Sequence, residues 1–315
     1  MESAASGNGL ASPASHSLHE CHTEEEFRAR FRAAVGFSAE SAADAIIAPE
    51  TPKAIFLVGS IPLGVATSGS DVDFVVVVDD KTSLSPRSSG IANSEQRIAF
   101  TNEGNSLVAG RFATSIGGVT VEVQVVVAPA LCGVLKRLRN RGPELDESEI
   151  MILGRLGTGW LLWESPRYLE RSGVILADPA FNVYCCTVHF VKALQLRRKA
   201  INAMELSDIP LVLHLGRLSV EAGYLAYFAS EGFSYLGARW LAHLGYGRGA
   251  RERLIRQPLL QQGIPLLFPQ HASSLEEAGH YLQMTSDFLR SMRRLIETKT
   301  LFRIAFLTCP QINPI

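Results

Sequence analysis

The sequence has few cysteines and no apolar run that could cross a membrane. A spanning helix needs about 20 consecutive apolar residues, and none of the 315 residues lie in such a run, although 47% are hydrophobic. The first twenty residues have neither a basic region nor an apolar core, so we expect no secretory signal. Five cysteines without framework spacing favour reduced thiols, and so we expect a cytoplasmic protein with no membrane partner.

Net charge is also nearly absent. The 30 lysines and arginines are balanced by 31 aspartates and glutamates, which leaves a formal charge of −1. Such a chain has no overall positive field to attract nucleic acid, so nucleic acid is not the expected partner. The length and the hydrophobic content suffice for two domains.

The chain is organised around two apolar runs separated by a short polar segment. Residues 54–58 predict a buried strand that ends at Gly59 and Ser60. Asp71 and Asp73 then lead into a second run, rich in β-branched residues. Because side chains alternate along a strand, the two aspartates share one face. Two carboxylates side by side in a buried strand repel each other, and a divalent cation would remove that cost.

A third strand is expected over residues 119–127, where Glu122 interrupts an apolar segment. A glutamate inside such a strand needs a partner. One hypothesis places Glu122 with Asp71 and Asp73 around the cation. The other makes it the structural ion-pair partner of an arginine such as Arg111.

Strand signals nearly vanish after about residue 145, and the rest predicts a bundle of helices. The boundary falls within 145–180, and residues 160–163 are either a short strand or a link. The expected helices cover residues 23–35, 38–47, 129–139, 147–156, 182–203, 211–230, 235–243 and 274–298; further strands are expected over 98–101 and 107–114, and loops over 245–249 and 262–269.

The pattern from Ile55 to Val127 resembles the nucleotidyltransferase superfamily typified by DNA polymerase beta. Its elements are an apolar strand, Gly-Ser, Ser-Asp-x-Asp at a second strand, and a later strand with another acid. Small-molecule members, such as the antibiotic nucleotidyltransferases, have a similar helical second domain. The resemblance implies an α/β (α+β) fold with a mixed sheet and a C-terminal helical bundle.

The implied organisation has three parts. The small and polar residues 1–20 predict a disordered tail. The resemblance implies that residues 21–160 form the nucleotidyltransferase domain and 161–315 a helical substrate-binding domain. In one departure, Leu63 and Gly64 stand where family members often have Arg-Gly. That puts a phosphate contact from this position in doubt, although it leaves the metal site untouched.

The resemblance also implies the chemistry. The expected reaction moves a nucleoside monophosphate from a nucleoside triphosphate to a hydroxyl or similar group of a small molecule and releases pyrophosphate. The expected donor is ATP, which supplies AMP, or another nucleoside triphosphate. Two Mg²⁺ or Mn²⁺ ions would assist this transfer. Asp71 and Asp73 would hold both ions, and Glu122 would complete the acceptor-side ion or accept the acceptor's proton. The expected nucleotide-binding positions are Gly59, Ser60 and Ser70.

Other interpretations remain open at this level. The acceptor could be a protein or an RNA 3′ end, or the fold could be a non-catalytic nucleotide-binding relic. Asp71 could be a strand-entry residue, and Ser60 could only satisfy backbone donors. Asp79 and Asp80 are expected in a solvated turn. A helix of the second domain carries Lys192, Arg197 and Arg198, which either form a solvated face or clamp the triphosphate. The sequence leaves the acceptor, the nucleobase and the oligomeric state undetermined.

Overall fold

The computed structural model describes residues 23–35, 38, 52–63, 66, 70–79, 107–116, 119–139, 145–172, 179–233, 258–269, 271–309 and 311–312. The chain divides into two compact units, Met1–Ile175 and Leu176–Ile315, each considered by itself below. The expected tail over 1–20, the helix over 235–243, the strand over 98–101 and the loop over 245–249 lie outside the described residues, as does all but residue 38 of the helix expected over 38–47.

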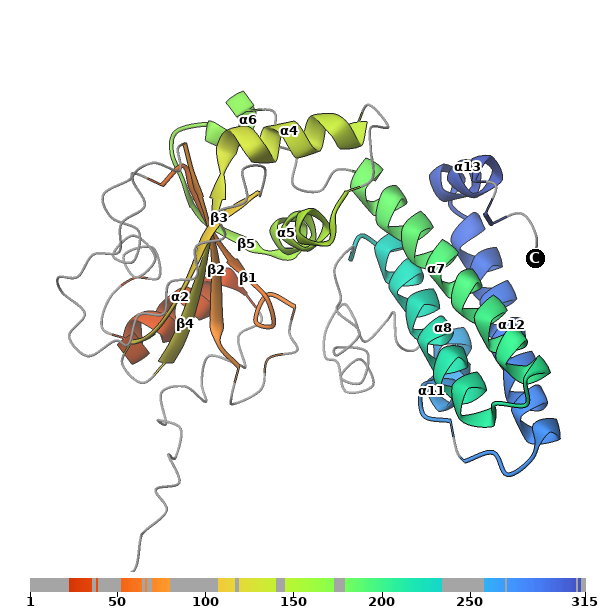
Figure 1. Ribbon diagram of the computed structural model, residues 1–315. Coiled ribbons are helices and arrows are strands. Elements are labelled where there is room, and N and C mark those ends of the chain that lie inside the picture. Colours follow the sequence, from red (N-terminus) through yellow and green to blue (C-terminus); the bar gives the residue numbers. More distant parts are fainter. Residues whose placement is uncertain are drawn as a thin grey trace, which may run out of the picture. The chain divides into compact units, whose positions relative to one another are not determined.

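The first unit is built on a five-stranded mixed sheet in the order β3-β4-β2-β1-β5 (Figure 1). Its elements are α2 (Glu24–Val35), β1 (Ala54–Val58), β2 (Val72–Val78), β3 (Val108–Ile116), β4 (Val119–Val127), α4 (Ala128–Arg139), α5 (Glu147–Thr158), β5 (Trp160–Glu164) and α6 (Tyr168–Ser172). Strands β2 and β4 are parallel, whereas the other neighbouring pairs are antiparallel. The predicted fold class is confirmed, and β5 is a strand rather than a link.

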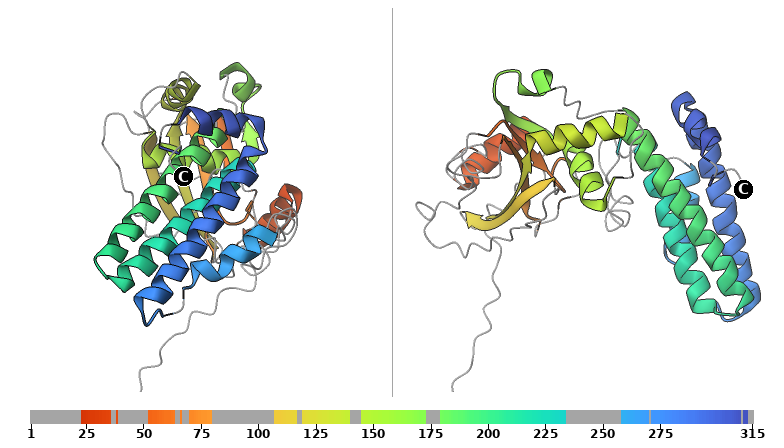
Figure 2. Two further views of the ribbon diagram at one scale, coloured as in Figure 1. Left: turned by 90° about the vertical axis from the view of Figure 1, so that its right-hand side faces the viewer. Right: turned by 45° about the horizontal axis from the view of Figure 1, so that its top comes forward.

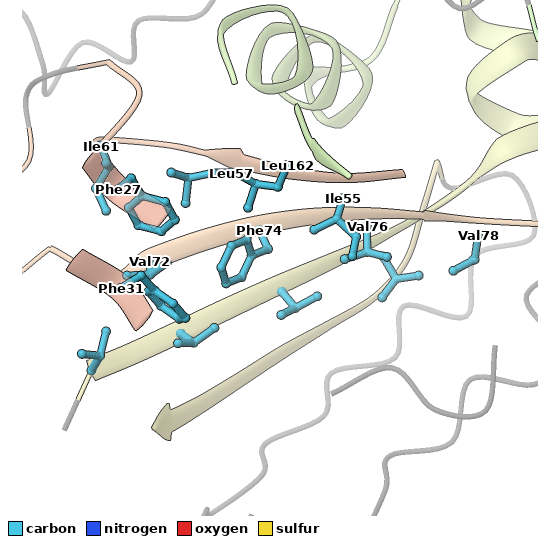
Figure 3. Close-up of a cluster of buried hydrophobic side chains, with 14 of the residues drawn as sticks. Phe27, Phe31, Ile55, Leu57, Ile61, Val72, Phe74, Val76, Val78 and Leu162 are labelled. Atoms are coloured by element: carbon cyan, nitrogen blue, oxygen red, sulfur yellow. The ribbon is translucent and has the colours of Figure 1, made fainter. Parts of the chain in front are cut away.

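Helix α2 covers one face of the sheet. Its N-terminus is capped by Thr23, whose hydroxyl accepts a hydrogen bond from the Glu26 amide at 3.2 Å. Phe27 and Phe31 lie one turn apart and pack on the apolar side chains of β1, β2 and β4 (Figure 3). The ring of Phe31 meets that of Phe74 edge-on, with centroids 6.1 Å apart. Each fully buried side chain of this size contributes roughly 1.5–3 kcal/mol, so this face is the core of the unit.

Asp73 lies between Val72 and Phe74 in β2, so alternation places its side chain on the face of the sheet opposite to theirs. Helix α5 packs against β1. It begins with a capping box, in which the Asp146 carboxylate accepts from the Glu149 amide at 2.8 Å and Glu149 accepts from the Asp146 amide at 3.1 Å. Glu149 also pairs with Arg137 of α4, so that part of the basic end of α4 is used internally.

The second unit is helical, as predicted. Its elements are α7 (Pro179–Glu205), α8 (Ile209–Ser230), α11 (Pro258–Leu267), α12 (Leu275–Glu297) and α13 (Thr300–Thr308). Helices α7, α8 and α12 pack side by side (Figure 2). Among the described helices, none is both long and apolar enough to cross a bilayer.

One expectation for this unit is wrong. Residues 262–269 were expected to form a loop because they contain glycine and two prolines, yet α11 continues to Leu267. Pro258 occupies the first helical position, where a missing amide hydrogen costs little, and Leu260, Leu266 and Leu267 are buried. Burial of these side chains outweighs the low helix propensity of the segment.

Candidate active site

The carboxylates predicted from the sequence lie on two adjacent parallel strands. Asp73 of β2 is the register partner of Glu122 of β4. Paired residues of neighbouring strands point to the same face, so these two side chains stand next to each other. Asp71 lies two residues before Asp73, directly ahead of β2. The structure thus brings together the three acidic residues proposed to share one site.

The three carboxyl groups affect one another electrostatically. Burial raises the pKa of Asp73 to about 6, against the positive charge of Arg155 and with the help of Glu122 and Asp71. Burial and the nearby Glu122 also raise the pKa of Asp71. A hydrogen bond between Asp73 and Glu122 adds to the rise for Asp73, because the proton on one carboxyl is shared with the other. Clustered acids of this kind are typical of functional sites.

Gly59 holds the end of β1 against this cluster. Its φ is +80°, a conformation that side chains with a Cβ rarely adopt. A Cβ at this position would stand 2.2 Å from Asp73 Oδ2 and 3.2 Å from Asp73 Cβ. Glycine is therefore required both by the backbone angle and by the close approach of the aspartate.

The other predicted nucleotide-binding positions flank the cluster. Ser60 follows Gly59 in the turn and is buried, and Ser70 directly precedes Asp71. Leu63 is buried as well. Leu63 therefore packs in the interior and offers no phosphate contact of the kind an arginine at this position could make. Gly64 lies outside the described residues.

The structure gives no support to an ion pair between Glu122 and Arg111. Arg111 is exposed on β3, and its register partner is Gln124. The cross-strand neighbours of Glu122 are Asp73 on one side and Ala113 on the other. The polar cross-strand neighbour of Glu122 is consequently another acid.

Arg155 of α5 is a member of this site that the sequence argument missed. Its charge acts on the Asp73 carboxylate, and its Nε and Nη1 atoms are buried with no hydrogen-bond partner in the described part of the chain. The only sequence signal was an arginine four residues before Gly159, at the end of a helix next to a strand. That signal is too common to single out a functional residue.

The donor set suits a hard divalent cation. Carboxylate oxygens are the protein ligands that Mg²⁺ prefers, with water and phosphate oxygens completing its coordination. Within the described residues, no three histidine, cysteine, aspartate or glutamate side chains already surround a common point as a finished metal site.

The remaining predicted polar residues do not belong to the cluster. Asp79 is exposed and pairs with Lys53 at 2.8 Å, while Asp80 lies outside the described residues. Lys192 and Arg198 are exposed on α7, and Arg197 donates from Nε to the Ser286 hydroxyl at 2.6 Å. The last contact ties α7 to α12, so Arg197 has a structural role within the second unit.

Comparison with known proteins agrees with this geometry. Residues 43–113 match the model of the nucleotidyltransferase domain family. The chain contains a nucleotidyltransferase domain. This match agrees with the resemblance of residues 55–127 to the polymerase beta-like nucleotidyltransferase superfamily. The matched segment includes Gly59, Ser60, Asp71 and Asp73, and it ends before Glu122.

No curated protein matches the chain. Among solved structures, a nucleotidyltransferase-like protein from Exiguobacterium sibiricum is similar to 87% of this chain over 79% of its own, with 15% sequence identity and a TM-score of 0.42. A TM-score this low does not establish a common fold for the two whole chains. The assignment of the nucleotidyltransferase domain therefore rests on the family match.

Proposed function

We propose that this protein transfers a nucleoside monophosphate, AMP from ATP, to a hydroxyl or similar group of a small molecule and releases pyrophosphate. The observation that carries the proposal is the register of Asp73 with Glu122, with Asp71 two residues away and Gly59 in contact with Asp73. This arrangement gathers three carboxyl groups at the end of a strand that follows a Gly-Ser turn. The family match supplies the reaction class.

In this proposal Asp71 and Asp73 hold the divalent cations, and Glu122 faces the acceptor. When bound, two Mg²⁺ ions neutralise charge on the attacking oxygen, the α-phosphate and the leaving pyrophosphate. A bond forms between the acceptor oxygen and the α-phosphorus while the bond to the β-phosphate oxygen breaks, and the acceptor's proton passes to Glu122. Gly59 allows close backbone approach, and Ser60 donates to a phosphate oxygen.

A small acceptor is preferred over a macromolecule because of the charge of the chain. Positive and negative side chains balance within one charge, whereas an RNA-binding surface is expected to be basic and aromatic. Transfer to a protein side chain or to an RNA 3′ end is the alternative. A binding-only relic is disfavoured, since a protein that only bound nucleotide would have no need for three interacting acids.

One experiment would decide among these functions. The protein is incubated with Mg²⁺, a metabolite extract of the source organism and one radiolabelled nucleoside triphosphate at a time. The expected product is a small molecule heavier by one nucleoside monophosphate, formed together with an equal amount of pyrophosphate. Label found only on protein or RNA would replace the small-molecule proposal. Triphosphate binding that ignores Mg²⁺ and yields no product would indicate the relic.

The Glu122→Gln variant separates a chemical role of Glu122 from a structural one. If Glu122 accepts the proton or completes the metal site, turnover should fall by roughly tenfold to a hundredfold or more, while triphosphate binding and the melting temperature change little. The measurement is turnover, binding and thermal unfolding on one preparation. Lower stability with unchanged turnover of the folded fraction would show that Glu122 is only structural.

A further inference from the structure

Helix α5 brings Arg155 directly onto the end of β1. The helix ends at Gly159, and a Cβ at that position would lie 2.7 Å from the Leu57 carbonyl oxygen and 3.0 Å from Val58 Cγ1. Arg155 is one helical turn before Gly159, so it lies on the same side of the helix. Val58 is the register partner of Asp73 and immediately precedes Gly59. Arg155 is therefore placed at the Gly-Ser turn and beside the acidic cluster.

The guanidinium of Arg155 is not satisfied by the protein around it. Its Nε and Nη1 are buried and have no hydrogen-bond partner in the described part of the chain. A buried donor left without an acceptor destabilises the protein, and more so when it is charged. The side chain as a whole is only partly buried, and its long stem allows the planar group to turn toward an incoming acceptor.

The acceptors already present do not explain this position. The charge of Arg155 acts on Asp73, yet the hydrogen bond of Asp73 is made with Glu122. In the proposed function Asp73 turns its oxygens to a metal ion. A guanidinium in this place could bind an anion that also contacts the divalent cation and the Gly-Ser turn. Phosphate suits this role, because arginine binds it through two parallel donors.

We propose that Arg155 binds the β- and γ-phosphates of the nucleoside triphosphate through the N–H groups of its guanidinium. This inference rests on the proposed function, because it assigns one more contact to the same nucleotide. It places a phosphate-binding residue in the nucleotidyltransferase domain itself, on the helix that packs against the Gly-Ser strand. As pyrophosphate departs, its growing negative charge faces the guanidinium.

The test compares ligands that have or lack the β- and γ-phosphates. Binding of α,β-methylene ATP, inorganic pyrophosphate and AMP is measured with Mg²⁺ for the unmodified protein, Arg155→Gln and Arg155→Lys. Arg155→Gln should weaken binding of the ATP analogue and of pyrophosphate about tenfold to a hundredfold, with AMP binding nearly unchanged. Arg155→Lys keeps the charge but lacks the planar guanidinium, so its affinity for the ATP analogue should lie between those of the unmodified protein and Arg155→Gln.

Arg167→Gln is the matched control, because it removes the same charge from an exposed ion pair with Glu170 in the same unit. Unchanged binding of the ATP analogue by Arg155→Gln, or an equal loss for AMP, would overturn the inference and leave a counter-ion role for Arg155. If Arg155→Gln does not fold, Arg155→Lys decides by the same comparison. Failure of the unmodified protein to bind the analogue at all would instead remove the proposed function and this inference together.

Discussion

Replacing Asp73 with asparagine is expected to lower nucleotidyl-transfer turnover by on the order of a hundredfold or more while making the protein more stable near neutral pH. Turnover falls because the amide cannot carry the negative charge that holds a divalent cation. Stability rises because the native carboxylate is ionised in a site that disfavours its charge. Asp71→Asn should show the same loss of turnover, with a smaller gain in stability because Asp71 lies outside the strand.

The gain in stability has a defined pH dependence. Burial, with Glu122 and Asp71, raises the pKa of Asp73 from 3.8 to about 6. Between these values the folded protein keeps a proton that the unfolded chain has lost, so stability falls as the pH rises. The penalty is complete above about pH 6 and amounts to at most about 3 kcal/mol. Asp73→Asn should thus melt higher than the unmodified protein at pH 8 and at about the same temperature at pH 4.

The measurements are turnover with Mg²⁺ and thermal unfolding across this pH range, both in the presence and in the absence of a chelator. Asp79→Asn is the control, since it removes a carboxylate from an exposed position paired with Lys53. Asp79→Asn should leave turnover intact and should not raise the melting temperature at pH 8. Full turnover in both Asp71→Asn and Asp73→Asn would contradict the proposed mechanism.

The acidic cluster was predictable because it depends on local patterns. Apolar runs marked β1, β2 and β4, and alternation placed Asp71 and Asp73 on one face. That Glu122 would face Asp73 could not be deduced from alternation alone, since β3 lies between the two strands in the sequence while β2 and β4 are neighbours in the sheet. The hypothesis that Glu122 shares a site with Asp71 and Asp73 required these two strands to lie close together, and the register of β2 with β4 agrees with it.

Arg155 and α11 were missed for a common reason. Which side of α5 faces the sheet depends on the fit of Gly159 against Leu57, a contact between segments about 100 residues apart in the chain that no local pattern encodes. Likewise, α11 is helical because Leu260 and Leu266 are buried by the rest of the bundle. In both cases tertiary packing decided what local propensity left open.

Gly59→Ala is expected to lower turnover by on the order of a hundredfold through a single added methyl group, because a small displacement of a catalytic group is costly. The φ of +80° strains any residue with a Cβ, at about 1–2 kcal/mol. The larger effect comes from the contacts, since the methyl carbon would lie 2.2 Å from Asp73 Oδ2 and 3.1 Å from its Cγ. The whole Asp73 side chain therefore has to leave its present position beside Glu122.

Gly232→Ala separates the contact from the strain. Gly232 also has a positive φ, of +92°, but a Cβ there would meet nothing within 4 Å. Its alanine variant should therefore lose a similar amount of stability and keep its turnover. In Gly59→Ala, adding Asp73→Asn should cost little further turnover, because both changes disable the same carboxylate. If Gly59→Ala turns over as fast as Gly232→Ala, the position of Asp73 does not limit the reaction, and the metal-holding role assigned to it is wrong.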